Sequence, residues 1–259
     1  MPDGGCSSMA VSGVRIMSEL LTSALEAHGG LANWRRYSTI SADAASGGEL
    51  LDRKAPQNAD PRRMTVWMHE QRASVTPFGS ADQRSAFRSD RVAIEKLSGA
   101  TVAERSNPRL SFEGDDLDTP WDPLKRAYFN GYAMWSYLTV PFSLTLPGVR
   151  VGEIEPIMEN GQTWQGLEVI MPDDVATHSR VQKFYFGDDF LLRRQDYTLD
   201  VAGGANVANY ASAIVEIQGI RLPSKRRAYM CDHAYRPLKD RLLIWIDLTN
   251  LTFARSRAQ

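Results

Sequence analysis

The stretch that decides the fold is residues 121–149, WDPLKRAYFNGYAMWSYLTVPFSLTLPGV. Positions 127–149 carry no charged residue. A membrane span is excluded, because proline and glycine interrupt the run and the part before Pro141 is too short to cross a hydrocarbon core of about 30 Å. Apolar and aromatic residues before Pro141 recur at spacings of three and four. They predict a helix of about four turns, capped by Asp122 or Thr119.

From residue 38 to the end, outside this stretch, the dominant period of the apolar residues is two. Residues 64–69 and 242–249 alternate in the way that is typical of strands. Asn160-Gly161 has the composition of a type I′ turn, and Gly187–Asp189 and Ser98-Gly99 are expected to close two further hairpins. Short turns join antiparallel neighbours, and no βαβ alternation appears. We therefore expect about nine to eleven strands in one antiparallel sheet.

The fold class that follows is mainly β (α+β): a single strongly curved antiparallel sheet, or half-barrel, whose concave face is covered by an N-terminal helix and the central helix. The first helix is predicted from Ser18 to about His28, where a protonated imidazole would favour the helix dipole. Residues 17–255 are expected to form one domain. Residues 1–16 are expected to be a disordered extension, with Met17 as the functional start.

The composition is that of a soluble globular protein. The chain of 259 residues is 43% hydrophobic and 24% charged, with a net charge of -1, which gives no indication of nucleic-acid binding. Its two cysteines and four scattered histidines offer no spacing for a metal site, so no metal or cofactor is expected. Without a recognisable signal peptide or transmembrane helix, a cytoplasmic location is expected. The oligomeric state is left open.

The charges are distributed unevenly along the chain. Residues 53–109 carry eleven Lys/Arg against six Asp/Glu, residues 113–200 carry seven against fifteen, and residues 221–259 carry nine against three. These segments either offset one another within the fold or form a basic patch for an anionic ligand.

A half-barrel of this kind can leave a cavity between sheet and helix. Aromatic side chains combine apolar area with a polar tip that orients a ligand. The candidates to line such a cavity are Tyr128, Tyr132, Trp135, Trp164, Phe184, Phe186 and Tyr197. For each of them, an ordinary place in the core is the alternative.

A polar constellation accompanies the hairpin around Gly187–Asp189. It comprises Thr177, His178, Ser179, Gln182, Arg193, Arg194, Asp196 and Tyr197. Pairing about the turn would bring His178, Arg194 and Asp196 to one face. Three interpretations remain open: a cross-strand ladder of salt bridges and hydrogen bonds, an anchor for a ligand headgroup, and an acid–base catalytic cluster.

The order of these features resembles a known superfamily. Ala27-His28-Gly29-Gly30-Leu31 is followed by Trp34, extended strands, the central helix and further hairpins. This order is similar to the lipoprotein-carrier superfamily, which contains the periplasmic carrier and its outer-membrane acceptor. The chain resembles more closely a group of uncharacterised bacterial proteins that share the Ala-His-Gly-Gly pattern, Trp121-Asp122, Thr177-His178-Ser179 with Gln182, and Asp196-Tyr197.

The carriers hold acyl chains in a cavity under a helical lid, so the resemblance implies a hydrophobic or amphipathic small-molecule ligand such as an acyl chain or lipid. The chain departs from the carriers in lacking a recognisable export signal. Two alternatives are retained: an enzyme that acts on a hydrophobic small molecule through His178, Arg194 and Asp196, and a structural domain without a small ligand.

Overall fold

The computed structural model describes residues 18–56 and 60–255. The expected extension over residues 1–16 therefore lies outside the described residues. In the described part the strands are β1 (Tyr37–Gly47), β2 (Arg62–Trp67), β3 (Arg72–Thr76), β4 (Gln83–Arg88), β5 (Arg91–Lys96), β6 (Thr101–Ser106), β7 (Arg150–Glu159), β8 (Gln162–Ile170), β9 (Val181–Phe186), β10 (Leu192–Leu199), β11 (Ala205–Ile217), β12 (Ile220–Cys231) and β13 (Pro237–Arg255).

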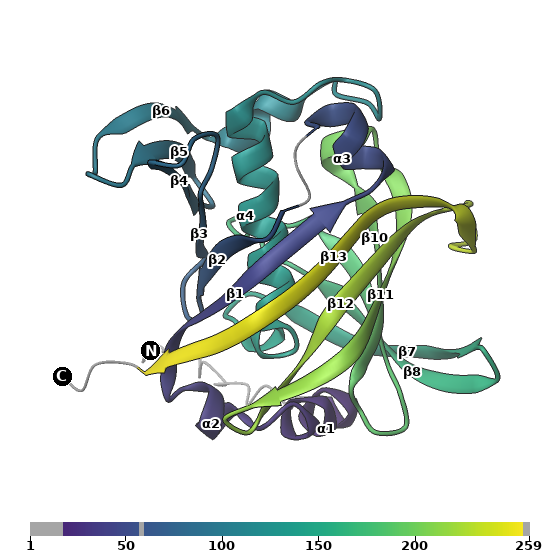
Figure 1. Cartoon of the computed structure of the whole chain (residues 1–259). Helices are drawn as coiled ribbons and strands as arrows, with labels where there is room; N and C mark the ends of the chain where they lie inside the picture. Colours follow the sequence, from purple (N-terminus) through teal and green to yellow (C-terminus); the bar gives the residue numbers. More distant parts are fainter. Residues whose placement is uncertain (1–17, 57–59, 256–259) are drawn as a thin grey trace, which may run out of the picture.

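These strands form one antiparallel sheet in the order β6-β5-β4-β3-β2-β1-β13-β12-β11-β10-β9-β8-β7. The chain meanders from the centre to one edge, crosses to the other edge, and meanders back until β13 pairs with β1. Figure 1 shows the strong curvature of the sheet. The fold class is confirmed. The sheet has thirteen strands rather than nine to eleven, because short strands such as β3 and β4, of five and six residues, give too few alternations to be counted from the pattern.

The residues in the hairpin turns determine the backbone conformation of each turn. Asn160 and Gly161 have φ angles of 52° and 77°, as a type I′ turn between β7 and β8 requires. Ser98 and Gly99 lie in the turn between β5 and β6. The turn after β9 is longer than expected, because Phe190 is left-handed with a φ of 57° and β10 begins only at Leu192.

The first part of the uncharged stretch, together with the four residues before it, forms the central helix α4 (Pro123–Thr139), around which the sheet curves (Figure 1). Asp122 caps it by accepting a hydrogen bond of 2.8 Å from the backbone N–H of Lys125. The helix is buried on nearly all sides and contacts β2 to β6. A Cβ atom at Gly131 would lie 2.2 Å from Cγ of Phe87 on β4, so glycine is required for this close approach. Among the described residues, no helix is long and apolar enough to span a membrane.

The remaining helices are short. They are α1 (Glu19–Ala27), α2 (Leu31–Trp34) and α3 (Glu49–Lys54), with 3-10 turns η1 (Pro108–Phe112), η2 (Phe142–Thr145) and η3 (Asp200–Ala202). Helices α1 and α2 lie at one end of the curved sheet (Figure 1). Ser18 caps α1 and His28 follows its last turn, as predicted. Burial lowers the pKa of His28 to about 4, so its imidazole is neutral at pH 7 and adds no positive charge at this end of the helix.

Candidate ligand-binding site

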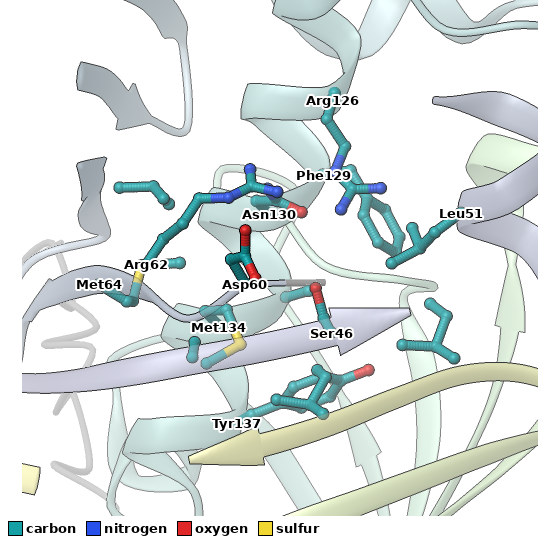
Figure 2. A pocket seen from close by; sticks show the side chains of 15 residues that line it. Ser46, Leu51, Asp60, Arg62, Met64, Arg126, Phe129, Asn130, Met134 and Tyr137 are labelled. Carbon is teal, nitrogen blue, oxygen red and sulfur yellow. The ribbon is translucent and has the colours of Figure 1, made fainter. Parts of the chain in front are cut away.

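A small apolar cavity lies between one face of α4 and strands β1, β2, β3 and β13 (Figure 2). We call it the α4 cavity; its volume is about 40 Å³. The helix contributes Arg126, Phe129, Asn130, Ala133, Met134 and Tyr137, and the strands contribute Ala44, Ser46, Met64, Val75, Ile244 and Ile246. The helical residues recur every three or four positions, so they form a stripe that extends about 16 Å along the helix axis.

The cavity exists because small side chains face each other across the interface between sheet and helix. Ala44 and Ser46 on β1 and Ala133 on α4 are too short to fill the space between the two elements. Met64 and Met134 fill part of it. Methionine has three rotatable bonds and adapts to irregular gaps, so the volume can change by rotation of these two side chains.

Charged side chains border the α4 cavity at the end near Arg126. Asp60 and Arg62 lie together there, and Arg126 approaches from the helix (Figure 2). Arg126 is only 2% exposed, yet its Nε and Nη1 atoms have no hydrogen-bond partner in the part of the chain that the structure describes. Burial lowers the pKa of Arg126 to about 10, and the positive charge of Arg62 contributes. The guanidinium therefore stays charged at neutral pH.

Tyr137 connects the other end of the α4 cavity to a buried polar cluster. Its hydroxyl oxygen lies 2.8 Å from Nε2 of His178 and 3.0 Å from the hydroxyl oxygen of Tyr197. The rings of His178 and Tyr197 stack with their centroids 4.0 Å apart, and Tyr132 packs edge-on against His178. Burial holds the pKa of His178 well below its usual value, so the imidazole is neutral.

Arg194 and Asp196 form a separate cluster on the opposite face of β10. The guanidinium of Arg194 binds both carboxylate oxygens of Asp196, with Nε–Oδ1 and Nη2–Oδ2 distances of 2.6 and 2.9 Å. It also contacts Glu159 at 2.9 Å and donates to the Tyr235 carbonyl oxygen at 2.7 Å. Burial raises the pKa of Asp196 to about 6, although the positive charge of Arg194 opposes the shift.

The expectation that His178, Arg194 and Asp196 share a face is therefore wrong. Successive strand residues point to opposite faces, so Tyr197 faces the core with His178 while Arg194 and Asp196 face outward. His178 itself lies in the loop after β8 rather than in a strand. The geometry supports a structural ion pair and a separate neutral histidine, not one acid–base cluster.

The other aromatic candidates lie in the core or on the outer face. Phe184 and Phe186 on β9 are core residues, and Tyr128 packs against Phe87 and Phe112. Trp135 donates through Nε1 to the carbonyl oxygens of Trp67 and Glu70, at 3.0 and 2.9 Å. Trp164 packs edge-on against Tyr210, outside the main core. None of the predicted site residues lines the α4 cavity.

Sequence reasoning missed Arg126 and Tyr137, although a pattern could have indicated both. Arg126 is the last charged residue before the uncharged run, and it shares the helical stripe that leads to Tyr137. A single arginine at the end of a long apolar helix face indicates a charged group that borders a buried apolar region.

Metal-binding chemistry is not supported by the described residues. No group of three or more His, Cys, Asp or Glu side chains is arranged to hold an ion within residues 18–56 and 60–255. Cys231 is a free, buried thiol, and burial raises its pKa to about 11.

The buried histidines predict a loss of stability in mild acid. His28 and His178 stay neutral in the folded chain where the unfolded chain is protonated, so the unfolded state binds more protons as the pH falls from 6.5 towards 4. Each histidine lowers the free energy of unfolding by about 1.4 kcal/mol per pH unit in that window. Asp196 acts in the opposite sense below pH 6, because its folded-state pKa is raised.

Urea unfolding at pH 6.5, 5.5 and 4.5 measures this dependence. His28→Gln keeps an acceptor for the N–H of Leu192, which donates to Nε2 of His28, and should remove about 1.4 kcal/mol per pH unit from the slope. His233→Gln at an exposed position is the control and should leave the slope unchanged. An unaltered slope in His28→Gln would contradict the prediction.

Comparison with known proteins finds solved structures with a similar fold. No protein-family model matches the sequence, and no curated protein does. A putative outer membrane lipoprotein-sorting protein domain from Vibrio parahaemolyticus matches with a TM-score of 0.53 at 10% identity, over 92% of this chain and 94% of that one. The resemblance to the lipoprotein-carrier superfamily is thereby confirmed at the level of the fold.

Two further solved structures are similar over nearly their whole length. A LolA superfamily protein from Nitrosomonas europaea has a TM-score of 0.48 at 10% identity, over 91% of this chain and 94% of that one. A DUF1329 family protein from Desulfovibrio piger has a TM-score of 0.45 at 11% identity, over 92% of this chain and 93% of that one.

Proposed function

We propose that this protein binds a hydrophobic or amphipathic small molecule, such as an acyl chain, in the α4 cavity. The observation that carries the proposal is the apolar stripe of α4, which faces small and flexible side chains across an incompletely filled space. The fold shared with a putative lipoprotein-sorting domain adds to it. In this proposal the ligand lies along α4, with Tyr137 at one end and Arg126 at the other.

Ligand entry requires the α4 cavity to expand. A volume of about 40 Å³ holds a few water molecules and not an acyl chain. Rotation of Met64 and Met134 costs about 1 kcal/mol for each strained side chain. Burial of each methylene group contributes about 0.8 kcal/mol, so a chain with ten buried methylenes gains about 8 kcal/mol and offsets the rearrangement.

Filling the cavity with a side chain tests the proposal. Ala133→Leu should occupy the space between α4 and β1, so it should weaken the binding of a fluorescent fatty acid at least tenfold. Native mass spectrometry of the purified protein should find a bound chain in the wild type and less of it in the variant.

Ala234→Leu is the matched control, because it adds the same side chain at an exposed position away from the cavity. It should bind the probe like the wild type. Wild-type protein that takes up no fatty acid, or an Ala133→Leu variant that is folded and binds with unchanged affinity, would overturn the proposal.

A further inference from the structure

We infer that Arg126 binds the anionic headgroup of the ligand, so that the ligand is a single-chain amphiphile with a carboxylate or phosphate group at one end. The inference rests on the proposed function, since it places the headgroup at the end of the α4 cavity. It goes further by assigning the chemical class of the ligand and its direction in the cavity.

Arg126 differs from the other buried cations of the described chain. Lys54 donates to the carbonyl oxygens of Asp116 and Thr119, and Arg194 is paired with Asp196. Arg226 donates to the Tyr137 carbonyl oxygen and lies over the ring of that tyrosine. Arg126 alone among these cations has no hydrogen bond or ion pair to a described residue.

An unpaired buried guanidinium is unfavourable in the free protein. Arginine remains charged, and a charge removed from water is stabilised only by a counter-ion or by hydrogen-bond acceptors. Its position in the first turn of α4 adds to the cost, because the helix dipole is positive there. A ligand that supplies an anion removes this penalty when it binds.

The surrounding charges fit an anion that carries one negative charge. Asp60 and Arg62 lie beside each other at the same end of the cavity (Figure 2), and burial lowers the pKa of Arg62 while Asp60 opposes the shift. With Arg126, this end holds one more positive than negative charge. Nε and Nη1 point in different directions and each lacks a partner among the described residues, so either one can donate to an oxygen atom of a headgroup.

The test compares three ligands with the same sixteen-carbon chain: hexadecanoate, hexadecyl phosphate and hexadecanol. Displacement of a bound neutral fluorescent probe gives the affinity of each one. In the wild type, hexadecanoate should bind about 10- to 100-fold more tightly than hexadecanol. The relative affinity of hexadecyl phosphate then shows which kind of anionic headgroup the site prefers.

Arg126→Gln should abolish the preference for the anion, so that hexadecanoate and hexadecanol bind to this variant with equal affinity. Arg53→Gln on α3 is the control for the overall charge of this region, because its guanidinium is exposed and paired with Glu49 and Asp118. It should keep the preference. If Arg126→Gln does not fold, Arg126→Met provides the same comparison, and its unfolding temperature should not fall below that of the wild type.

The outcomes separate this inference from the proposed function. Equal affinity for hexadecanoate and hexadecanol in the wild type would overturn the headgroup assignment and leave chain binding intact. A preference that persists in the folded Arg126 variants would also overturn it. Failure of all three ligands to bind the wild type would overturn both.

Discussion

Replacement of Arg194 with methionine is expected to lower the free energy of unfolding by about 3–5 kcal/mol. The substitution leaves the Asp196 carboxylate buried without its partner, and Asp196 is only 3% exposed. It also removes the donors to Glu159 and to the Tyr235 carbonyl oxygen, which connect the end of β7 and the loop before β13 to β10. Urea unfolding at pH 7 measures the loss.

Two further variants distinguish the loss of the Arg194–Asp196 ion pair from a general effect of removing an arginine. Arg194→Met combined with Asp196→Leu should recover most of the stability, because an apolar pair of similar volume replaces both charges. Arg221→Met is the matched control, since Arg221 and Glu216 form an exposed ion pair. It should change stability by less than about 1 kcal/mol. A loss in Arg194→Met no larger than that of Arg221→Met would contradict the prediction.

The fold could be predicted from the sequence because its determinants are local. The uncharged run, preceded by Asp122 and Pro123, defined α4. Asn160-Gly161 defined a hairpin, and the period of two identified β2 and β13. These patterns act over a few residues, so no knowledge of distant contacts was needed. Short strands such as β3 and β4 give too little periodicity, so the number of strands was underestimated.

The site could not be predicted in the same way, because it depends on which face of each element is covered. Both faces of β10 are buried, so the alternation of Gln195, Asp196 and Tyr197 does not reveal which side faces the core. His178 lies in a loop, where periodicity gives no direction at all. The aromatic residues of α4 were predicted to line a cavity. Their large rings instead fill the space between the helix and the sheet. The cavity lies instead where alanine, serine and methionine meet.

Replacement of Trp135 with alanine is expected to destabilise the fold by about 3–5 kcal/mol, because a large side chain that is only 2% exposed is lost from the middle of α4. Trp135→Phe separates the packing of this side chain from its hydrogen bonds. Phenylalanine keeps most of the packing but cannot donate to the Trp67 and Glu70 carbonyl oxygens, so a loss of about 1–3 kcal/mol is expected.

The two hydrogen bonds of Trp135 attach the end of β2 and the turn before β3 to α4, so their loss should act first on those strands. Hydrogen exchange should become faster in β2 and β3 of folded Trp135→Phe, and should stay unchanged in β11 and β12, which lie across the sheet. Trp245→Phe, at a partly exposed position on β13, is the control and should alter neither region. If hydrogen exchange became faster to the same extent in all strands, the indole would stabilise the fold only through its packing and not through its two hydrogen bonds. Because β2 and β3 carry Met64 and Val75, a selective effect would mean that the same helix both fills the curved sheet and holds one wall of the α4 cavity in place.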